Sequence, residues 1–146
     1  MQLDDAAAKS RLCDEVLRAL PDWFGLEQSV RDYVRDVAGL PFFAVGRDGF
    51  LALKLHDPAA AEVYVMGVLP DRHRHGVGSA LMDAGETFLR ERGVEYLQAK
   101  TLGPSRPDEH YAATRRFYES RGFRPLEETT AFWGEENPCL IMVKRL

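Results

Sequence analysis

Residues 62–102 carry the pattern that most restricts how this chain can fold. The segment "EVYVMGV" (62–68) is rich in β-branched residues and predicts a buried strand, and "VEYLQAKTL" (94–102) predicts another. Between them, "SALMDAGETFLRERG" (79–93) has apolar residues at helical spacing and ends in a glycine. A strand, a helix and a second strand in succession form a crossover that places the two strands parallel in one sheet. The segment therefore predicts an α/β fold.

The sequence on either side of this unit adds further helices and strands. Proline or glycine ends each of two N-terminal helical patterns, and "GRDG" is typical of a tight turn between strands. With 146 residues the chain is long enough for one packed core, so we expect a single domain over 1–146. The other predicted elements are helices at 6–20, 27–40 and 111–122, and strands at 42–45, 50–56, 123–133 and 139–146.

The charge balance and the apolar pattern exclude several classes of protein. A formal net charge of −4 argues against a general nucleic-acid binder, which carries a basic excess. No apolar run reaches the ~20 residues of a membrane-spanning helix. The first ten residues lack a signal-peptide pattern, so we expect a cytoplasmic protein with no membrane partner. Cys13 and Cys139 lack metal-ligand spacing and are interpreted as reduced thiols.

The turn "LPDRHRHGVGS" joins the first strand of the crossover to its helix and predicts an anion site. Free N–H groups and the helix dipole favour negative charge at a helix N-terminus. Gly76 and Gly78 let the backbone approach a phosphate closely. Basic and hydrogen-bonding side chains add to this: Arg72, His73, Arg74 and His75.

The turn also has several other interpretations. An ATP-binding loop requires a lysine after the last glycine, and a dinucleotide fingerprint requires a third glycine where Leu81 stands. The spacing of His73 and His75 suggests a metal, but no cysteine or carboxylate stands nearby at ligand spacing, so no metal site is expected. A solvated basic loop whose glycines cap a helix remains the structural alternative.

Two segments resemble the signatures of the GNAT superfamily, the acyl-CoA-dependent N-acyltransferases. "VMGVLPDRHRHGVGSALM" is similar to its coenzyme A signature, and "RRFYESRGFRPLE" to its second signature. The resemblance implies a mixed, mostly antiparallel sheet with a central crossover and two N-terminal helices, and a first strand that is short or missing, reduced to "MQLDD". Two positions depart from the family pattern: His73 stands for Arg or Gln, and Tyr111 for asparagine.

The resemblance also implies the donor and the residues that bind it. Acetyl-CoA would be the donor, with coenzyme A as the product. The backbone groups of Met66 and Val68 would bind the pantetheine arm and orient the thioester. The turn would hold the pyrophosphate through His73, Arg74, His75, Gly76, Val77, Gly78 and Ser79.

Acetyl transfer to an amine needs a base that takes a proton from the acceptor amine and an acid that gives a proton to the leaving thiolate. Tyr118 matches the family tyrosine beside the sulfur and is the candidate acid; the alternative is a packed tyrosine. Glu62 matches the position of a glutamate base, and the alternative is an exposed glutamate at a strand end. Tyr64 shares its face by period-two alternation, and His110, expected in a loop, is a second titratable candidate. Since neither signature contains a cysteine, direct attack in a ternary complex is expected.

Aromatic and acidic clusters suggest where an acceptor binds. Trp23, Phe24 and Trp133 are candidates for a wall that binds a cation, with nearby acids as counter-charges. A small-molecule amine is the expected acceptor, a peptide or protein amine is the other possibility, and a homodimer is common in the superfamily. The alternative functions are an acyl-CoA sensor without turnover and an interaction module that keeps the fold.

Overall fold

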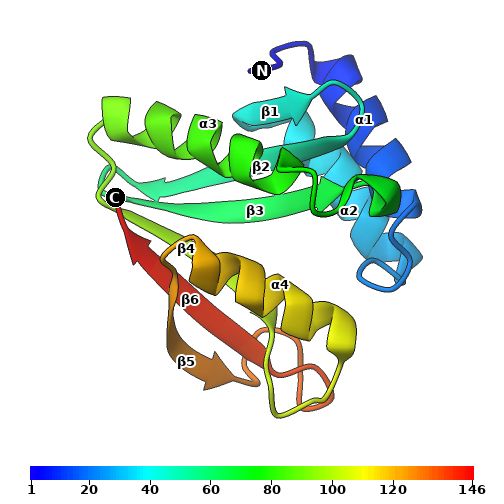
Figure 1. The fold of residues 1–146 in the computed structure, drawn as a ribbon, viewed down its shortest axis with the longest axis vertical. Helices are drawn as coiled ribbons and strands as arrows, with labels where there is room; N and C mark the ends of the chain where they lie inside the picture. Colours follow the sequence, from blue (N-terminus) through cyan, green and yellow to red (C-terminus); the bar gives the residue numbers. More distant parts are fainter.

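The computed structural model describes residues 1–146, whose strands form one six-stranded sheet in the order β1-β2-β3-β4-β6-β5 (Figure 1). Only the central β3–β4 pair is parallel, as the crossover predicts, and the other pairs are antiparallel. The mixed, mostly antiparallel sheet is therefore confirmed. The strands are β1 (Phe42–Val45), β2 (Gly49–Asp57), β3 (Ala60–Val68), β4 (Tyr96–Leu102), β5 (Arg124–Thr129) and β6 (Cys139–Arg145).

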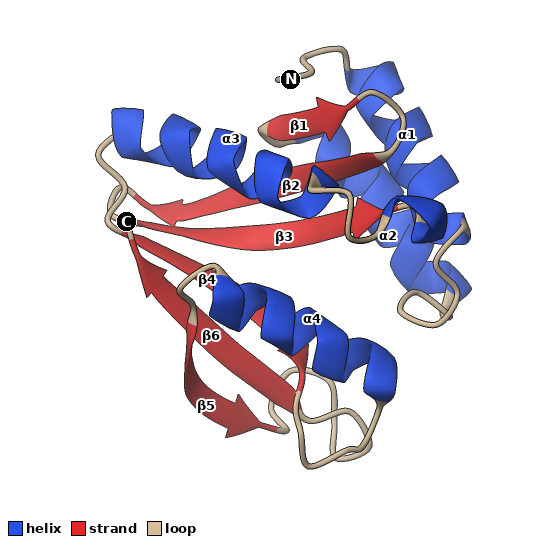
Figure 2. Ribbon diagram, viewed as in Figure 1, coloured by secondary structure: helices blue, strands red, loops and turns tan.

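Four α-helices cover parts of both faces of this sheet. The helices are α1 (Ala6–Arg18), α2 (Glu27–Asp36), α3 (Val77–Glu91) and α4 (Glu109–Ser120). In Figure 2, α3 crosses β1–β3 on one face with α1 and α2 behind, and α4 lies on the same side as α3 over β4 and β6. The face of β4, β6 and β5 opposite α4 carries no helix. None of the helices has both the length and the apolar character needed to cross a membrane.

The first half of β2, residues 49–53, is buried on both of its faces because this part of the sheet lies between two hydrophobic cores. Leu51 and Leu53 pack under α3, in a core that continues under α4 to Phe123. Phe50 and Ala52 point the other way, into the core formed with α1 and α2. This alternation explains why β2 is apolar at successive positions rather than at every second one.

Several boundaries differ from the prediction by a few residues, and three of them affect the expected elements most. The expected first strand is reduced to a single bridge between Gln2 and Phe43. The second helix ends at Asp36, and its last turn is the 3-10 segment η1 (Val37–Gly39), because Leu40 is extended before a proline.

The strand predicted at 123–133 is wrong in its last four residues, since β5 ends at Thr129. There the Thr129 hydroxyl accepts a hydrogen bond from the N–H of Ala131, 3.2 Å away. The N–H of Gly134 then closes a turn onto the carbonyl of Thr130. A hydroxyl that binds the backbone two residues further on favours a turn over a continued strand.

Candidate active site

The connection between β3 and α3 holds a row of backbone N–H groups that have no protein partner. After β3 comes the 3-10 turn η2 (Pro70–Arg72), and α3 begins directly after Gly76. The N–H groups of Val77, Gly78 and Ser79 donate to no acceptor in the chain, and the first turn contains no acidic residue. Unpartnered donors at the positive end of a helix dipole attract an anion. The local structure that the turn predicts is therefore present.

The two positions of this turn that carry glycine need it for different structural reasons. Gly76 has a φ of 79°, in the left-handed region that side chains disfavour, and no atom lies within 4 Å of where its Cβ would stand. A Cβ on Gly78 would lie 3.1 Å from the ring of Phe117 on α4, so this glycine lets the two helices approach. Arg74, with a φ of 66°, is also left-handed. The open space at the turn is thus on the side of Gly76.

Beside this turn the sheet splits between β3 and β4. Their parallel pairing ends at Val63 and Ala99, although both strands continue. On the other side of β3, the register with β2 skips Tyr64, which is therefore an extra residue in a β-bulge. Figure 1 shows the two strands diverging from here, with α3 over one and α4 over the other. The edge of β3 from Tyr64 to Val68 faces no strand, so its backbone groups are free for a ligand.

Three of the residues predicted to bind the acetyl donor lie at this split: Met66, Val68 and His73. The side chains of Met66 and Val68 pack against the core under α3. His73 Nε2 lies 2.8 Å from the carbonyl oxygen of Val68, which accepts the hydrogen bond. His73 thus ties the turn to the end of β3, and one lone pair of that carbonyl remains for a ligand.

Tyr118, the candidate acid, is on α4 and is 7% exposed. Its ring packs edge-on against Phe123, and its hydroxyl makes no hydrogen bond within the chain but is not sealed from solvent. Burial raises the pKa of this phenol, and the charge of Glu62 raises it further. A phenol with a raised pKa keeps its proton at neutral pH and can donate it.

Glu62, the candidate base, is buried in the sheet with two polar partners from neighbouring strands. Its residue exposure is 8%, so the exposed strand-end alternative is not what the fold produces. His56 Nε2 on β2 lies 2.6 Å from Glu62 Oε1, and Lys100 Nζ on β4 lies 3.4 Å from Glu62 Oε2. The side chain of His56 is 35% exposed, so this dyad connects the buried carboxylate to solvent.

The hydroxyl of Tyr64 bonds a residue of α2 and makes no hydrogen bond with Glu62. The hydroxyl donates a short hydrogen bond to Asp36 on α2. Burial raises the pKa of Tyr64, with the hydrogen bond to Asp36 as the next cause. The ring stacks edge-on with Tyr33, which in turn stacks edge-on with Phe24. Tyr64 therefore belongs to an aromatic row that runs from β3 through α2 to the α1–α2 loop.

The α1–α2 loop is attached to α4 through Trp23. The indole Nε1–H donates to the Thr114 hydroxyl at 3.1 Å, and the Tyr111 hydroxyl donates to the Trp23 carbonyl at 2.7 Å. The indole also stacks edge-on with His110 at 4.8 Å and with His73 at 5.7 Å. Tyr111, which departs from the family pattern, therefore holds a loop here. Trp23 connects that loop to both α4 and the β3–α3 turn.

One of the sequence-based placements is changed by the fold. His110 is not in a loop but in the first turn of α4, where Asp108 caps the helix and Asp22 lies 3.6 Å from His110 Nε2. Trp133 is in the β5–β6 connection, as expected, where it is 43% exposed and takes part in no aromatic pair. Its role in acceptor binding stays a prediction.

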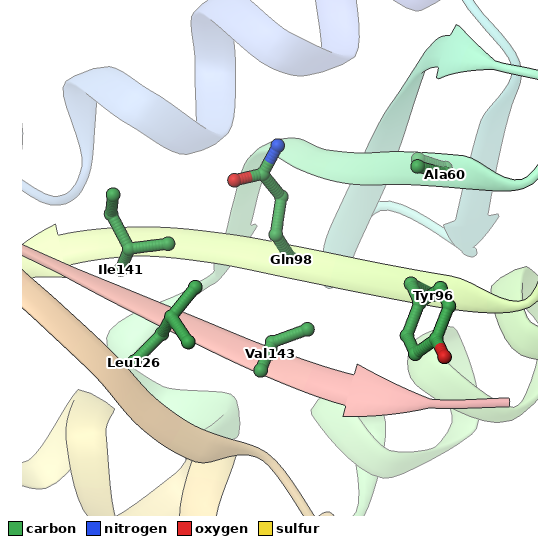
Figure 3. A pocket seen from close by; sticks show the side chains of 7 residues that line it. Ala60, Tyr96, Gln98, Leu126, Ile141 and Val143 are labelled. Atoms are coloured by element: carbon green, nitrogen blue, oxygen red, sulfur yellow. The ribbon is translucent and has the colours of Figure 1, made fainter.

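A shallow apolar groove of about 160 Å³ is lined by residues at the start of β3 and on β4, β5 and β6. Figure 3 shows its lining side chains, with Gln98 as the one polar member. Glu62 is the register partner of Gln98 and stands two residues after Ala60. None of the predicted site residues lines this groove, whose walls are Ala60, Ala61, Tyr96, Gln98, Leu126, Ile141 and Val143.

His56 and Lys100 are functional candidates that the sequence prediction missed. A signal for His56 was present, since a turn at 57–60 brings the residues before and after it together across a hairpin. Lys100 comes from a strand on the far side of the crossover, and only the β3–β4 register places it beside Glu62.

Comparison with known proteins identifies the family of this site. A family model described as "Acetyltransferase (GNAT) domain" matches residues 38–125, which include the bulged strand, the turn and the whole of α4. The chain belongs to the GNAT acetyltransferase family. The resemblance noted in the two sequence signatures is thereby confirmed.

Among relatives, a mycothiol acetyltransferase of Stackebrandtia nassauensis is 32% identical over 113 residues, which cover 75% of this chain and 33% of the relative. The chain spans a third or less of the length of the first mycothiol acetyltransferases that it matches.

Two solved structures share the GNAT fold. A GNAT-family protein of Desulfovibrio desulfuricans has a TM-score of 0.82 at 20% identity, covering 99% of this chain and 96% of that one. An aminoglycoside 6'-N-acetyltransferase complexed with coenzyme A has a TM-score of 0.74 at 16% identity, covering 99% and 96%. At these identities the likeness concerns the fold.

Proposed function

We propose that this chain transfers the acetyl group of acetyl-CoA to a primary amine of a small molecule, by direct attack within a ternary complex. The observation that carries the proposal is the placement of a buried carboxylate and a buried phenol at one split in the sheet. Glu62 and Tyr118 come from different elements, yet the charge of Glu62 raises the pKa of Tyr118. This electrostatic coupling supports the assignment of a base and an acid to one site.

Two independent features of the chain support binding of acetyl-CoA at the split between β3 and β4. Unpartnered N–H groups of Val77, Gly78 and Ser79 offer an anion site for the diphosphate, with Arg74 and His75 nearby. The free edge of β3 offers backbone groups at Met66 and Val68 for an extended arm that carries amides. Bound acetyl-CoA supplies a thioester that is activated for acyl transfer. The aminoglycoside acetyltransferase of similar fold was crystallised with coenzyme A.

The chain's own residues then handle the protons. An alkylammonium has a pKa near ~10.4, so its deprotonation at pH 7 costs about 4–5 kcal/mol unless a base takes the proton. Glu62 accepts that proton, and His56 passes it toward solvent because it is bonded to Glu62 and 35% exposed. On the other side, Tyr118 keeps a proton for the departing thiolate.

The acceptor enters from the side of α1 and α2 in this proposal. Phe24 and Trp23 are on the α1–α2 loop, and the aromatic row from Phe24 to Tyr64 leads to the strand that carries Glu62. Aromatic faces and the nearby Asp36 suit an ammonium group. Mycothiol acetyltransferases and an aminoglycoside acetyltransferase among the related proteins are consistent with a small polar amine.

The test is release of coenzyme A from acetyl-CoA across a panel of amines: aminoglycosides, amino sugars, polyamines, amino acids and peptides. We expect turnover with at least one small amine. Binding of acetyl-CoA, seen as a thermal shift, without turnover on a broad panel would favour the sensor alternative. No thermal shift with either acetyl-CoA or coenzyme A would contradict both.

A pair of variants tests the donor site separately. Gly76→Asp places a carboxylate in the open space of the turn and is expected to weaken acetyl-CoA binding roughly tenfold by like-charge repulsion. Gly76→Asn is the matched control, since asparagine tolerates the same left-handed φ without the charge. Equal affinities of the two variants, measured by calorimetry, would remove the diphosphate from this turn.

A further inference from the structure

Lys100 places a primary amine of the chain itself beside the candidate base. It is the first β4 residue after the last β3–β4 pair, so it stands where the sheet splits. Its Nζ lies 3.4 Å from Glu62 Oε2 and 4.6 Å from the centre of the Phe132 ring. A carboxylate and an aromatic face together make the surroundings that suit an acceptor ammonium. The side chain is 21% exposed.

The chain has four lysines, and the other three have different surroundings. Lys9 donates to the carbonyl of Leu40 under α1. Lys54 is exposed on β2, with its Nζ 5.7 Å from the Tyr64 ring centre. Lys144 also pairs with a buried glutamate, but that carboxylate is held by arginines and has no histidine beside it.

Lys100 is thus the one lysine whose carboxylate partner also bonds a histidine. His56 takes up the second side of Glu62 and is open to solvent. A proton that Glu62 removes from Lys100 can therefore pass through His56 to solvent. The Lys144–Glu86 pair has no such route. A neutral amine at the split would be a competent nucleophile.

We propose that Lys100 is an internal acceptor, and that the protein acetylates this lysine when acetyl-CoA is present and no external amine occupies the site. The proposal rests on the proposed function, since it uses the same donor, base and acid. Lys100 Nζ first gives one proton to Glu62, which passes it through His56 to solvent, and the neutral amine forms the C–N bond to the acetyl carbon. As the C–S bond breaks, the attacking nitrogen gives its second proton to Glu62, Tyr118 gives its proton to the sulfur, and coenzyme A leaves as the thiol. Tyr118 then takes a proton from solvent and Glu62 releases one, so that one proton is released overall.

Acetylation would change the site chemically. The amide of acetyl-lysine carries no charge, so the ion pair with Glu62 is lost and His56 becomes the only side chain that bonds this carboxylate. The unmodified lysine, in contrast, occupies the position that an external ammonium needs. External amines and Lys100 therefore compete for Glu62.

The experiment uses the full chain with isotope-labelled acetyl-CoA and no added amine. Aliquots are quenched over time and digested with chymotrypsin, and peptide mass spectrometry quantifies acetylation at each of the four lysines. We expect Lys100 to be modified at least about tenfold faster than exposed Lys54, because a held acceptor gains from proximity. The rate per molecule should not depend on protein concentration, and a good external amine should slow it.

Two variants complete the test. Glu62→Gln should reduce modification of Lys100 to the rate at Lys54, and Lys100→Arg should abolish the fast phase. Modification of Lys100 no faster than Lys54, or unchanged by Glu62→Gln, would overturn the inference. If an external amine turns over while Lys100 stays unmodified, only this inference fails. If acetyl-CoA binds but neither acceptor is acetylated, the proposed function fails with it.

Discussion

Two glutamates are buried in this protein, and their surroundings differ in a way that separates structure from chemistry. Glu86 on α3 is 2% exposed and contacts Arg90, Arg121 and Lys144, the last at 2.7 Å. Glu62 on β3 is 8% exposed and contacts a histidine and one lysine, the lysine at the longer distance of 3.4 Å. The first carboxylate is surrounded by permanent cations, whereas the second has a partner that can exchange protons.

The difference teaches how a buried carboxylate is used. A carboxylate that bonds several cationic side chains is stabilised in its charged form. It also links the helices and strands that carry those side chains. Glu86 connects α3 to β6 through Lys144 and to the end of α4 through Arg121. A carboxylate beside an imidazole can pass a proton on, because histidine changes its charge in the physiological range. Four experiments test this distinction.

The largest effect is expected from Glu86→Gln. The change leaves Lys144 and Arg121, whose side chains are only 17% and 19% exposed, without their buried counter-charge. Removing one partner of a buried ion pair costs about 3 kcal/mol or more in the free energy of unfolding. Urea denaturation measures this cost, and a loss under about 1 kcal/mol would mean that the cluster behaves like a surface pair.

Glu62→Gln is expected to have the opposite profile. Turnover should fall about 100-fold, because the acceptor ammonium loses its base. The free energy of unfolding should fall by less than in Glu86→Gln, since one of the two partners of Glu62 is 35% exposed and screened by water. Steady-state kinetics and urea denaturation on the same preparation give both values. A stable, fully active Glu62→Gln protein would remove Glu62 from the base role.

His56→Gln should give a smaller and more specific defect. Glutamine can still donate a hydrogen bond to Glu62 but cannot carry a proton, so kcat should fall by up to about tenfold with little change in KM. Added imidazole should restore part of the lost kcat, whereas it should do nothing for Glu62→Gln. No rescue, or a defect confined to KM, would leave His56 with a purely structural role.

The smallest effect concerns the pKa of Tyr118. Its main cause is burial, and the charge of Glu62 is the second cause. Removing an anion makes a phenol easier to ionise, so Glu62→Gln should lower the pKa of Tyr118, and Glu86→Gln should leave it unchanged. Tyrosinate absorbance with pH, compared with the same variants carrying Tyr118→Phe, isolates this group. An equal shift in both glutamate variants would contradict the specific coupling.

The prediction from sequence succeeded where the signal lies in contiguous residues. The βα turn, with a left-handed Gly76 and free N–H groups before Ser79, follows from local glycine positions and helix geometry. Its strand and helix follow from the period of their apolar residues. The strand predicted past Thr129 failed because a hydroxyl-capped turn competed with strand propensity there.

The site itself was only partly accessible to such reasoning. Glu62 and Tyr118 were identified by likeness to family patterns. The partners of Glu62 come from β2 and β4, so their approach depends on strand register, which no local pattern specifies. The bulge at Tyr64 has no clear signature either, yet it turns the Tyr64 hydroxyl to Asp36 and opens the sheet.

The sequence by itself determined the α/β class, the crossover and the glycine turn at the start of α3, because each depends on residues that are neighbours along the chain. Only the tertiary structure decided which glutamate is fixed by arginines and which shares a histidine. Glu62 and Glu86 are the same residue type, and both are buried. Their difference comes from side chains up to 58 positions away, brought together by sheet register and helix packing. The chemistry of a buried charge is set by those distant partners.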